Sequence, residues 1–247
     1  MNNKKGMPMT HSSLPPVTLR TRELFDLTHT AARSQLEQTE YPWEILPRIA
    51  ATIAELGAAL DPERYLHPAP TVWIAKSSTV APTAYMGENV IIGEDTEVRH
   101  GAFIRGNALI GSGCVVGNST ELKNVILFDG VQVPHYNYVG DSVLGHCAHM
   151  GAGSITSNVK GDRSEVFIKA SPESGETFSP MPTGRYKCGG FLGDYAEVGC
   201  GCVLNPGVVL GAHCRIYPLV SVRGVIPPNS IHKGVGGIVP ARAHNDR

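Results

Sequence analysis

Nine aliphatic residues recur at a strict spacing of six between residues 74 and 122, and this column constrains the fold more than any other feature. The column comprises Ile74, Val80, Met86, Ile92, Val98, Ile104, Ile110, Val116 and Leu122. A second column, two positions earlier, holds mostly small residues such as Ser78, Ala84 and Ala102. In a hexapeptide repeat, three hexads make one triangular coil, with the aliphatic side chain inside and the small residue easing the corner. The pattern therefore predicts an all-β parallel β-helix.

The repeat changes phase and is interrupted once. After Leu122 the next interior aliphatic, Leu127, comes one residue early, and the same slip recurs at Leu144, which suggests loops or bulges at corners. Residues 160–186 hold three prolines and no hexad. We therefore expect an inserted loop or hairpin thrown out of one coil, with residues 166–169 (VFIK) as a short strand.

The period resumes after the insertion and sets the expected domain limits. Hexads continue from residue 192 to residue 222, and Pro227 and Pro228 end them. We assign residues 69–230 to the β-helix and residues 231–247 to a polar C-terminal tail.

Residues 1–68 are expected to form a tail followed by a helical extension. Residues 20–60 show helical spacing, with Pro42 opening a second helix and Gly57 stopping it. The apolar residues of that helix are Ile45, Leu46, Ile49, Ile53 and Leu56. Residues 61–70 read as a proline-rich linker. The apolar face should dock on the first coils, so deleting residues 1–68 should reduce stability and leave chemistry intact.

Composition excludes several partners. The net charge is −1 and charged residues are 17%, so there is no basic field for nucleic acid. No apolar run approaches the roughly 18 residues that span a membrane. The N-terminus lacks the apolar core of a signal peptide, and we expect a cytoplasmic protein. The six cysteines form no CxxC pair and are expected to be free thiols.

Four segments carry a family resemblance. VGNSTELKN (116–124), VPHYNYVGDSVLG (133–145) and GAGSITSN (151–158) resemble the C-terminal acetyltransferase domain of bifunctional N-acetylglucosamine-1-phosphate uridylyltransferases. TGRYKCGGFLGD (183–194) is more similar to the archaeal sugar-1-phosphate nucleotidylyltransferase/acetyltransferases. The resemblance covers about 71–228. It implies left-handed coils, acetyl-CoA as acyl donor without a metal, and an amino sugar phosphate as acceptor in nucleotide-sugar biosynthesis.

The resemblance also assigns roles to single residues. His135 takes the place of the catalytic base. The substrate-binding positions fall on Arg105, Lys123, Tyr138, Asn158 and Lys187, with Arg185 as an extra candidate. The positions that line the acetyl-CoA channel fall on Ala152, Cys200 and Pro218.

These residue types suit the chemistry. An amine that attacks a thioester must lose a proton, and a histidine with a pKa near neutrality can take it. A sugar phosphate needs cations, for which Arg105 and Lys123 are suited. Each follows an interior aliphatic, so it starts from a corner and can project towards a neighbouring chain. Sites shared between chains on a three-sided prism predict a homotrimer.

Two other functions stay open. Zinc enzymes of the γ-carbonic anhydrase type bind metal through three histidines across a subunit interface, and His100, His135, His146 and His149 are available here. The three-residue spacing of His146 and His149 does not match the wider spacing in those enzymes. The chain could also be a non-catalytic trimeric scaffold, with Tyr138 packing at the interface and Asn158 capping a turn. Glucosamine-1-phosphate is the first acceptor to consider, and the sugar identity stays open.

Overall fold

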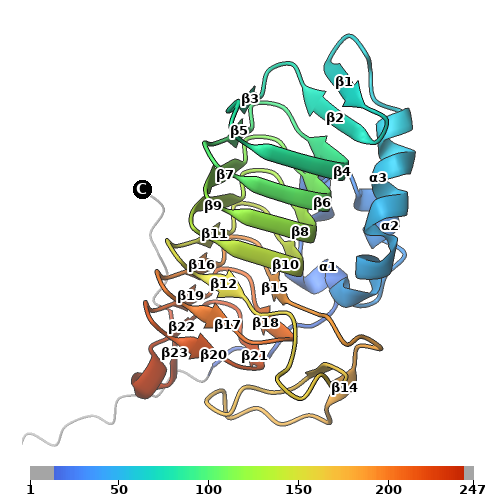
Figure 1. The fold of residues 1–247 in the computed structure, drawn as a ribbon. Coiled ribbons are helices and arrows are strands. Elements are labelled where there is room, and N and C mark those ends of the chain that lie inside the picture. Colours follow the sequence, from blue (N-terminus) through green and yellow to red (C-terminus); the bar gives the residue numbers. More distant parts are fainter. Residues whose placement is uncertain (1–13, 242–247) are drawn as a thin grey trace, which may run out of the picture.

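The computed structural model describes residues 14–241 and shows a left-handed parallel β-helix of about 9 turns (Figure 1). An N-terminal helical segment runs along one side of the coils, and a long loop leaves the coils near their C-terminal end. The fold class expected from the repeat is confirmed.

Each coil has three short faces. Face 1 contains β2 (Val72–Ala75), β15 (Gly190–Leu192), β18 (Val208–Leu210), β21 (Val225–Ile226) and the second halves of the long strands. Face 2 contains β3 (Thr79–Val80), β5 (Glu97–Val98), β7 (Val115–Asn118), β9 (Gln132–His135), β11 (His149–Met150), β16 (Glu197–Val198), β19 (Arg215–Ile216) and β22 (Ser230–His232). Face 3 contains β12 (Ile155–Thr156), β17 (Val203–Leu204), β20 (Ser221–Val222) and the first halves of the long strands.

The long strands bend from face 3 into face 1. They are β4 (Tyr85–Ile92), β6 (Phe103–Ile110), β8 (Glu121–Leu127) and β10 (Tyr138–Leu144). Between β6 and β8, Ile104 pairs with Leu122 but Gly106 pairs with Lys123, so Arg105 has no counterpart in the next coil. The first phase slip in the sequence is therefore a bulge at this corner, as the slip suggested.

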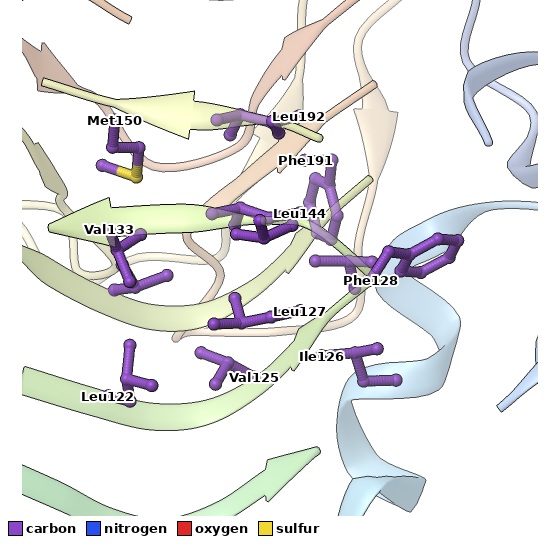
Figure 2. Close-up of a cluster of buried hydrophobic side chains, with 14 of the residues drawn as sticks. Leu122, Val125, Ile126, Leu127, Phe128, Val133, Leu144, Met150, Phe191 and Leu192 are labelled. Carbon is purple, nitrogen blue, oxygen red and sulfur yellow. The ribbon is translucent and has the colours of Figure 1, made fainter. Parts of the chain in front are cut away.

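The hexad column fills the interior. Figure 2 shows Leu122, Val133 and Met150 from successive coils pointing into the solenoid, while Ile126 and Phe191 point outward towards the helices. All five side chains are buried. Outward-facing residues on face 1 are therefore covered, whereas their equivalents on face 3, such as Tyr85 and Phe103, stay exposed.

The N-terminal extension covers face 1 over most of its length. Its helices are α1 (Thr21–Leu24), α2 (Arg33–Leu36), α3 (Ile49–Ala58) and the 3₁₀ helices η1 (Leu27–His29) and η2 (Pro42–Arg48). α3 packs on β4, β6 and β8, and η2 packs on β10. Further along the stack, the backbone N–H of Asp194 donates to the carbonyl of Leu24 (3.1 Å). The extension thus docks on the first coils, as expected, and also on coils far beyond them.

Two details of the N-terminal expectation are wrong. The helix opened by Pro42 continues to Ala58, so Gly57 does not stop it. A Cβ at Gly57 would lie 2.5 Å from the Trp73 ring, so packing explains this glycine. The supposed linker contains β1 (Tyr65–Ala69), which forms an antiparallel pair with β2 and extends the sheet at the start of the stack.

Short strands are present in the insertion and among the last described residues, up to residue 241. β13 (Phe167–Ile168) pairs antiparallel with β14 (Met181–Pro182), so the expected hairpin is present. After Pro228 the solenoid continues through β22, which pairs antiparallel with β23 (Ile238–Pro240), and the short 3₁₀ helix η3 (Gly234–Gly236) joins them. Residues 231–241, the described part of the segment assigned to a polar tail, therefore close the last coil. No helix within residues 14–241 has the length and apolar character needed to cross a membrane.

Candidate active site

The corner between face 3 and face 1 is built on a column of bent residues. Asn89, Asn107, Asn124 and Asp141 occupy equivalent places in successive coils, with φ of 56°, 50°, 56° and 48°. Asn and Asp tolerate this left-handed conformation better than other residues with a side chain. Their side chains also hydrogen-bond along the column, as from Asn89 Nδ2 to Asn107 Oδ1 (2.9 Å). Asp141 is the one position in this run that carries a charge.

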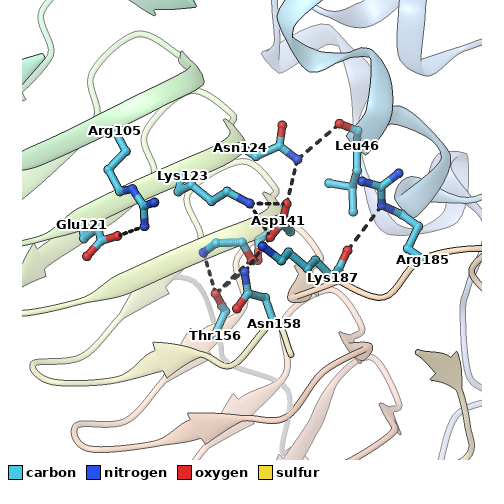
Figure 3. Close-up of polar contacts among 12 residues, drawn as sticks. Leu46, Arg105, Glu121, Lys123, Asn124, Asp141, Thr156, Asn158, Arg185 and Lys187 are labelled. Carbon is cyan, nitrogen blue, oxygen red and sulfur yellow. Dashed lines mark hydrogen bonds and ion pairs between the residues drawn. The ribbon is translucent and has the colours of Figure 1, made fainter. Parts of the chain in front are cut away.

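Asp141 gathers three donors around a buried carboxylate (Figure 3). Lys123 Nζ lies 3.1 and 3.0 Å from its two oxygens. Asn124 Nδ2 donates to Oδ1 (2.9 Å) and Asn158 Nδ2 donates to Oδ2 (2.6 Å). The Asp141 side chain is only 3% exposed and that of Lys123 is 28% exposed. A carboxylate this deeply buried needs such a counter-charge and full hydrogen bonding.

Two other residues that were predicted to bind the sugar phosphate lie at the same corner. Arg105 Nη1 donates to Glu121 Oε1 (2.8 Å) and is exposed, and this bond raises the pKa of the guanidinium further. The Tyr138 hydroxyl lies over Gly140, where a Cβ would approach it to 2.5 Å. Burial, followed by the charges of Asp141 and Glu121, raises the pKa of Tyr138, so its hydroxyl stays protonated at neutral pH.

The insertion brings Lys187 to this corner. The backbone N–H of Cys188 donates to the carbonyl of Asn158 (2.9 Å), so the two ends of the insertion meet. Figure 3 shows Lys187 extending towards Asp141 and Asn158. Arg185 Nε donates to the carbonyl of Lys187 (3.3 Å). Within the described residues, neither Lys187 nor Arg185 forms an ion pair.

We call this corner the lysine edge, defined by Arg105, Lys123, Asp141, Asn158 and Lys187. All five predicted substrate-binding residues lie at it or, for Tyr138, reach it with the hydroxyl. The edge carries cations whose charges are partly neutralised by Glu121 and Asp141.

The predicted base and channel residues lie at a different corner, between face 2 and face 3. The backbone N–H of Gly153 donates to the carbonyl of His135, and that of Gly201 donates to the carbonyl of Ala152 (both 2.9 Å). The N–H of Leu219 donates to the carbonyl of Cys200 (2.9 Å). These bonds place one residue per coil in a single row. We call it the histidine edge, defined by Asn118, His135, Ala152, Cys200 and Pro218.

His135 is exposed at the end of β9. Its Nδ1 lies 3.2 Å from Oδ1 of Asn118 in the preceding coil. An amide oxygen only accepts hydrogen bonds, so Nδ1 is the donor in this contact and Nε2 is the ring nitrogen left for another partner. Ala152, Cys200 and Pro218 are exposed beside it in the following coils. The histidine edge thus presents an imidazole at one end of a row of small or uncharged residues.

The two edges do not meet within one chain. They are the opposite borders of face 3, and the first half of β10, from Tyr138 to Gly140, crosses between them. The predicted residues therefore form two separate groups, with the base on one and the phosphate ligands on the other.

Sequence reasoning missed Asp141. A signal for it was present, because Asn89, Asn107, Asn124 and Asp141 recur at the coil spacing and only the last is charged. The motif drew attention instead to His135 and Tyr138, which precede it by six and three residues. Sequence reasoning also missed Asn124, whose Nδ2 contacts the carbonyl of Leu46 in η2 (3.3 Å). The extension thus touches the lysine edge.

The histidines considered as zinc ligands are dispersed. His146 lies under the extension, with its ring 3.7 Å from that of His29 and its Nδ1 2.7 Å from the carbonyl of Asp129. His149 Nδ1 lies 2.9 Å from Glu197 Oε2 on face 2. His100 Nδ1 lies 2.6 Å from Thr83 Oγ1. Among residues 14–241, no group of three or more His, Cys, Asp or Glu side chains is arranged to hold a metal ion.

Comparison with known proteins finds relatives that match part of this chain. Residues 86–169 match the family model described as the GMPPB C-terminal domain. The chain is 34% identical over 147 residues to the bifunctional sugar-1-phosphate nucleotidylyltransferase/acetyltransferase of Sulfurisphaera tokodaii, covering 52% of this chain and 35% of that protein. It is 32% identical over 115 residues to the bifunctional protein GlmU of Methanococcus maripaludis, covering 47% of this chain and 26% of that protein. The resemblance seen in the sequence is confirmed.

The matched region corresponds to about a third or less of the length of these relatives. Among solved structures, the acetyltransferase domain of PglB from Neisseria gonorrhoeae, in complex with acetyl coenzyme A, has a TM-score of 0.33 and 15% identity, covering 70% of this chain and 58% of that chain. At this similarity the solved structure carries no part of the functional argument.

Proposed function

We propose that this chain is an acyl-CoA-dependent N-acyltransferase that transfers the acetyl group of acetyl-CoA to the amine of an amino sugar phosphate. Glucosamine-1-phosphate is the first acceptor to test. One observation carries the proposal: every predicted substrate-binding side chain reaches the lysine edge, while the base and the predicted acetyl-CoA channel share the histidine edge. The relative described as a sugar-1-phosphate nucleotidylyltransferase/acetyltransferase supports the same reaction class.

His135 supplies the base in this proposal. Its Nε2 takes the proton from the acceptor amine as nitrogen bonds to the thioester carbon, and coenzyme A leaves as its thiol. Asn118 holds the imidazole in the required tautomer through Nδ1. Proton removal of this kind contributes about 10²- to 10⁴-fold to the rate.

The lysine edge supplies the phosphate site. Lys187 and Arg185 form no ion pair among the described residues, so their charge is available to an anion. Lys123 is held against Asp141, which fixes its direction and brings the net charge of this pair to zero. Arg105 is similarly paired with Glu121. The acceptor phosphate therefore binds chiefly to Arg185 and Lys187, at the C-terminal end of the insertion.

A homotrimer completes the site. The two edges border face 3, whose outward residues include the exposed aromatic pair Tyr85 and Phe103, with ring centroids 5.3 Å apart. A three-fold axis beside face 3 would bring the histidine edge of one subunit against the lysine edge of the next. Each of three equivalent interfaces would then hold one complete site.

A thiol-release assay tests the function. Purified protein is incubated with acetyl-CoA and a panel of amino sugar phosphates, and free coenzyme A is measured with a thiol reagent. We expect release that depends on an amino sugar phosphate and that falls by about 10²- to 10⁴-fold in His135→Ala, with little change in KM for acetyl-CoA. His149→Ala, which removes a partly exposed imidazole on face 2 one coil on, is the matched control. Acceptor-independent release, or full activity in His135→Ala, would contradict the proposal.

A further inference from the structure

A second basic pocket lies between the inserted hairpin and the last coils. It has a volume of about 310 Å³ and is open to solvent. Its lining includes three cations, Lys160, Lys169 and Arg223, together with the ring of Phe167 and the amide of Asn205. No Asp or Glu lines it. No residue of this pocket belongs to either edge of the candidate active site.

The walls of the pocket are firmly held. Val166 and Ile168 are buried, and a Cβ at Gly207 would lie 2.8 Å from Val166. Ala170 forms a parallel bridge with Val225, whose N–H donates to the carbonyl of Lys169 (2.9 Å). The hairpin is therefore fixed on the coils by backbone hydrogen bonds, and the pocket is preformed.

Two of the three cations are available to a ligand. Lys160 Nζ is engaged by Ser164, by the carbonyl of Glu165 (3.2 Å) and by Asp162 (3.7 Å). Lys169 and Arg223 are exposed and form no ion pair among the described residues. Phe167, 37% exposed, adds an aromatic face beside them. Cations that flank an aromatic ring suit a ligand with both a phosphate and a planar base.

The pocket is in line with the lysine edge. The N–H of Gly189 donates to the carbonyl of Asp141 (2.8 Å), and that of Gly207 donates to the carbonyl of Gly189 (2.8 Å). Gly207 is thus two rungs beyond Asp141, or about 10 Å along the stack at the usual strand spacing. One ligand with a sugar at one end and a nucleoside diphosphate at the other could therefore reach both places.

We propose that this pocket binds the nucleoside diphosphate part of a ligand, with Lys169 and Arg223 on the phosphates and Phe167 on the base. The inference rests on the proposed function and extends its acceptor class, because two possible reactants of such a transfer carry this chemistry. One is an acceptor whose amino sugar is linked to a nucleoside diphosphate, and the other is coenzyme A, whose adenosine end carries the same groups.

Direct binding tests the pocket without reference to turnover. Uridine diphosphate, guanosine diphosphate and coenzyme A are each titrated calorimetrically into the wild type and into Lys169→Ala/Arg223→Ala. We expect at least one of these ligands to bind the wild type and to bind the double variant at least about tenfold more weakly, since two charge-assisted contacts are lost. Arg22→Ala/Lys76→Ala removes two exposed cations elsewhere and should bind like the wild type. Melting temperatures check that each variant is folded.

The ligands that bind more weakly to the double variant show whether the pocket holds the acyl acceptor or the acyl donor. Weakening of the nucleoside diphosphates alone assigns the pocket to the acceptor, and weakening of coenzyme A alone assigns it to the donor. Phe167→Leu should weaken the nucleotide but leave inorganic pyrophosphate unchanged. Absence of binding to the wild type, or equal binding by the double variant and its control, would overturn the inference. Transfer to a simple sugar phosphate could survive that result, whereas nucleotide binding without any transfer would instead count against the proposed function.

Discussion

Lys123 Nζ contacts both carboxylate oxygens of Asp141, at 3.1 and 3.0 Å, on a side chain that is 3% exposed. The lysine expected to hold a phosphate is therefore already paired. Its partner belongs to the Asn column that turns each coil and connects through Asn124 to the N-terminal extension. The same corner therefore turns the backbone of each coil and carries the residues that are predicted to bind the substrate.

The Lys123–Asp141 pair should be strongly coupled. We expect a double-mutant cycle with Lys123→Met and Asp141→Asn to give a coupling energy of about 1–3 kcal/mol in denaturant unfolding, because either single change strands a largely buried polar group. The exposed Arg33–Glu37 pair (3.1 Å) is the control and should give about 0.3–0.5 kcal/mol. Equal coupling energies in the two cycles would show that the Lys123–Asp141 pair is no more strongly coupled than an exposed surface pair.

Shared sites predict complementation between inactive variants. Co-expression of His135→Ala with Lys187→Ala subunits should restore about one quarter of wild-type activity, since one interface in four receives both intact edges when subunits mix at random. Each variant alone should stay impaired. A mixture no more active than the two separate variants would place a complete site within one chain, and a monomer mass by light scattering would exclude the trimer.

The reactivity of Cys200 should show whether coenzyme A binds along the histidine edge. Burial raises the pKa of the Cys114, Cys188 and Cys214 thiols to about 12, so these should resist alkylation at mildly alkaline pH. Cys200 is exposed on the histidine edge and should react first. Peptide mapping by mass spectrometry should show that coenzyme A slows this reaction. Modification of Cys200 at the same rate with and without coenzyme A would move the donor away from the edge.

The last coil should weaken in acid. Burial lowers the pKa of His232 below its ordinary value of 6.5, partly offset by the charge of Glu173. The folded state therefore favours the neutral ring, and this contribution is complete above about pH 6.5 and is lost as pH falls through the lowered pKa. His232 Nδ1 also accepts a bond from the N–H of Gly234 (3.2 Å), which protonation removes.

Unfolding free energies measured at about pH 8 and about pH 5 test this sign. The wild type should lose more stability between them than His232→Asn, which keeps an acceptor near Nδ1 but does not titrate. A larger loss in the variant would contradict the assignment.

The extension should be essential to the solenoid. Ile49 and Ile53 are fully buried against face 1, so Ile49→Ala or Ile53→Ala should cost about 2–5 kcal/mol, whereas Glu55→Ala on the exposed side should cost little. Because Leu46 contacts Asn124, we now expect deletion of residues 1–68 to impair acceptor binding as well as stability, unlike the expectation from sequence. A folded truncation with an unchanged KM for the acyl acceptor would instead show that the extension contributes to stability alone.

The sequence alone determined the solenoid, because each hexad repeats the same local pattern. An aliphatic residue points into the interior and a small residue lies at the turn. The sequence also indicated that one face is covered, because Ile91, Leu109 and Ile126 point outward and are nevertheless apolar. These apolar residues could not show which segment covers them. The helices that do so precede the repeat in the chain and pack across many coils, which is a long-range contact without a local signal.

The division of the candidate site was decided only by tertiary structure. His135 and Asp141 are six residues apart in sequence yet stand at opposite borders of face 3, because one strand crosses between them. Conversely, Asn158 and Cys188 are hydrogen-bonded although the whole insertion separates them. In a β-helix, proximity follows the corner a residue occupies rather than its distance along the chain, and the corner depends on every preceding slip in the repeat.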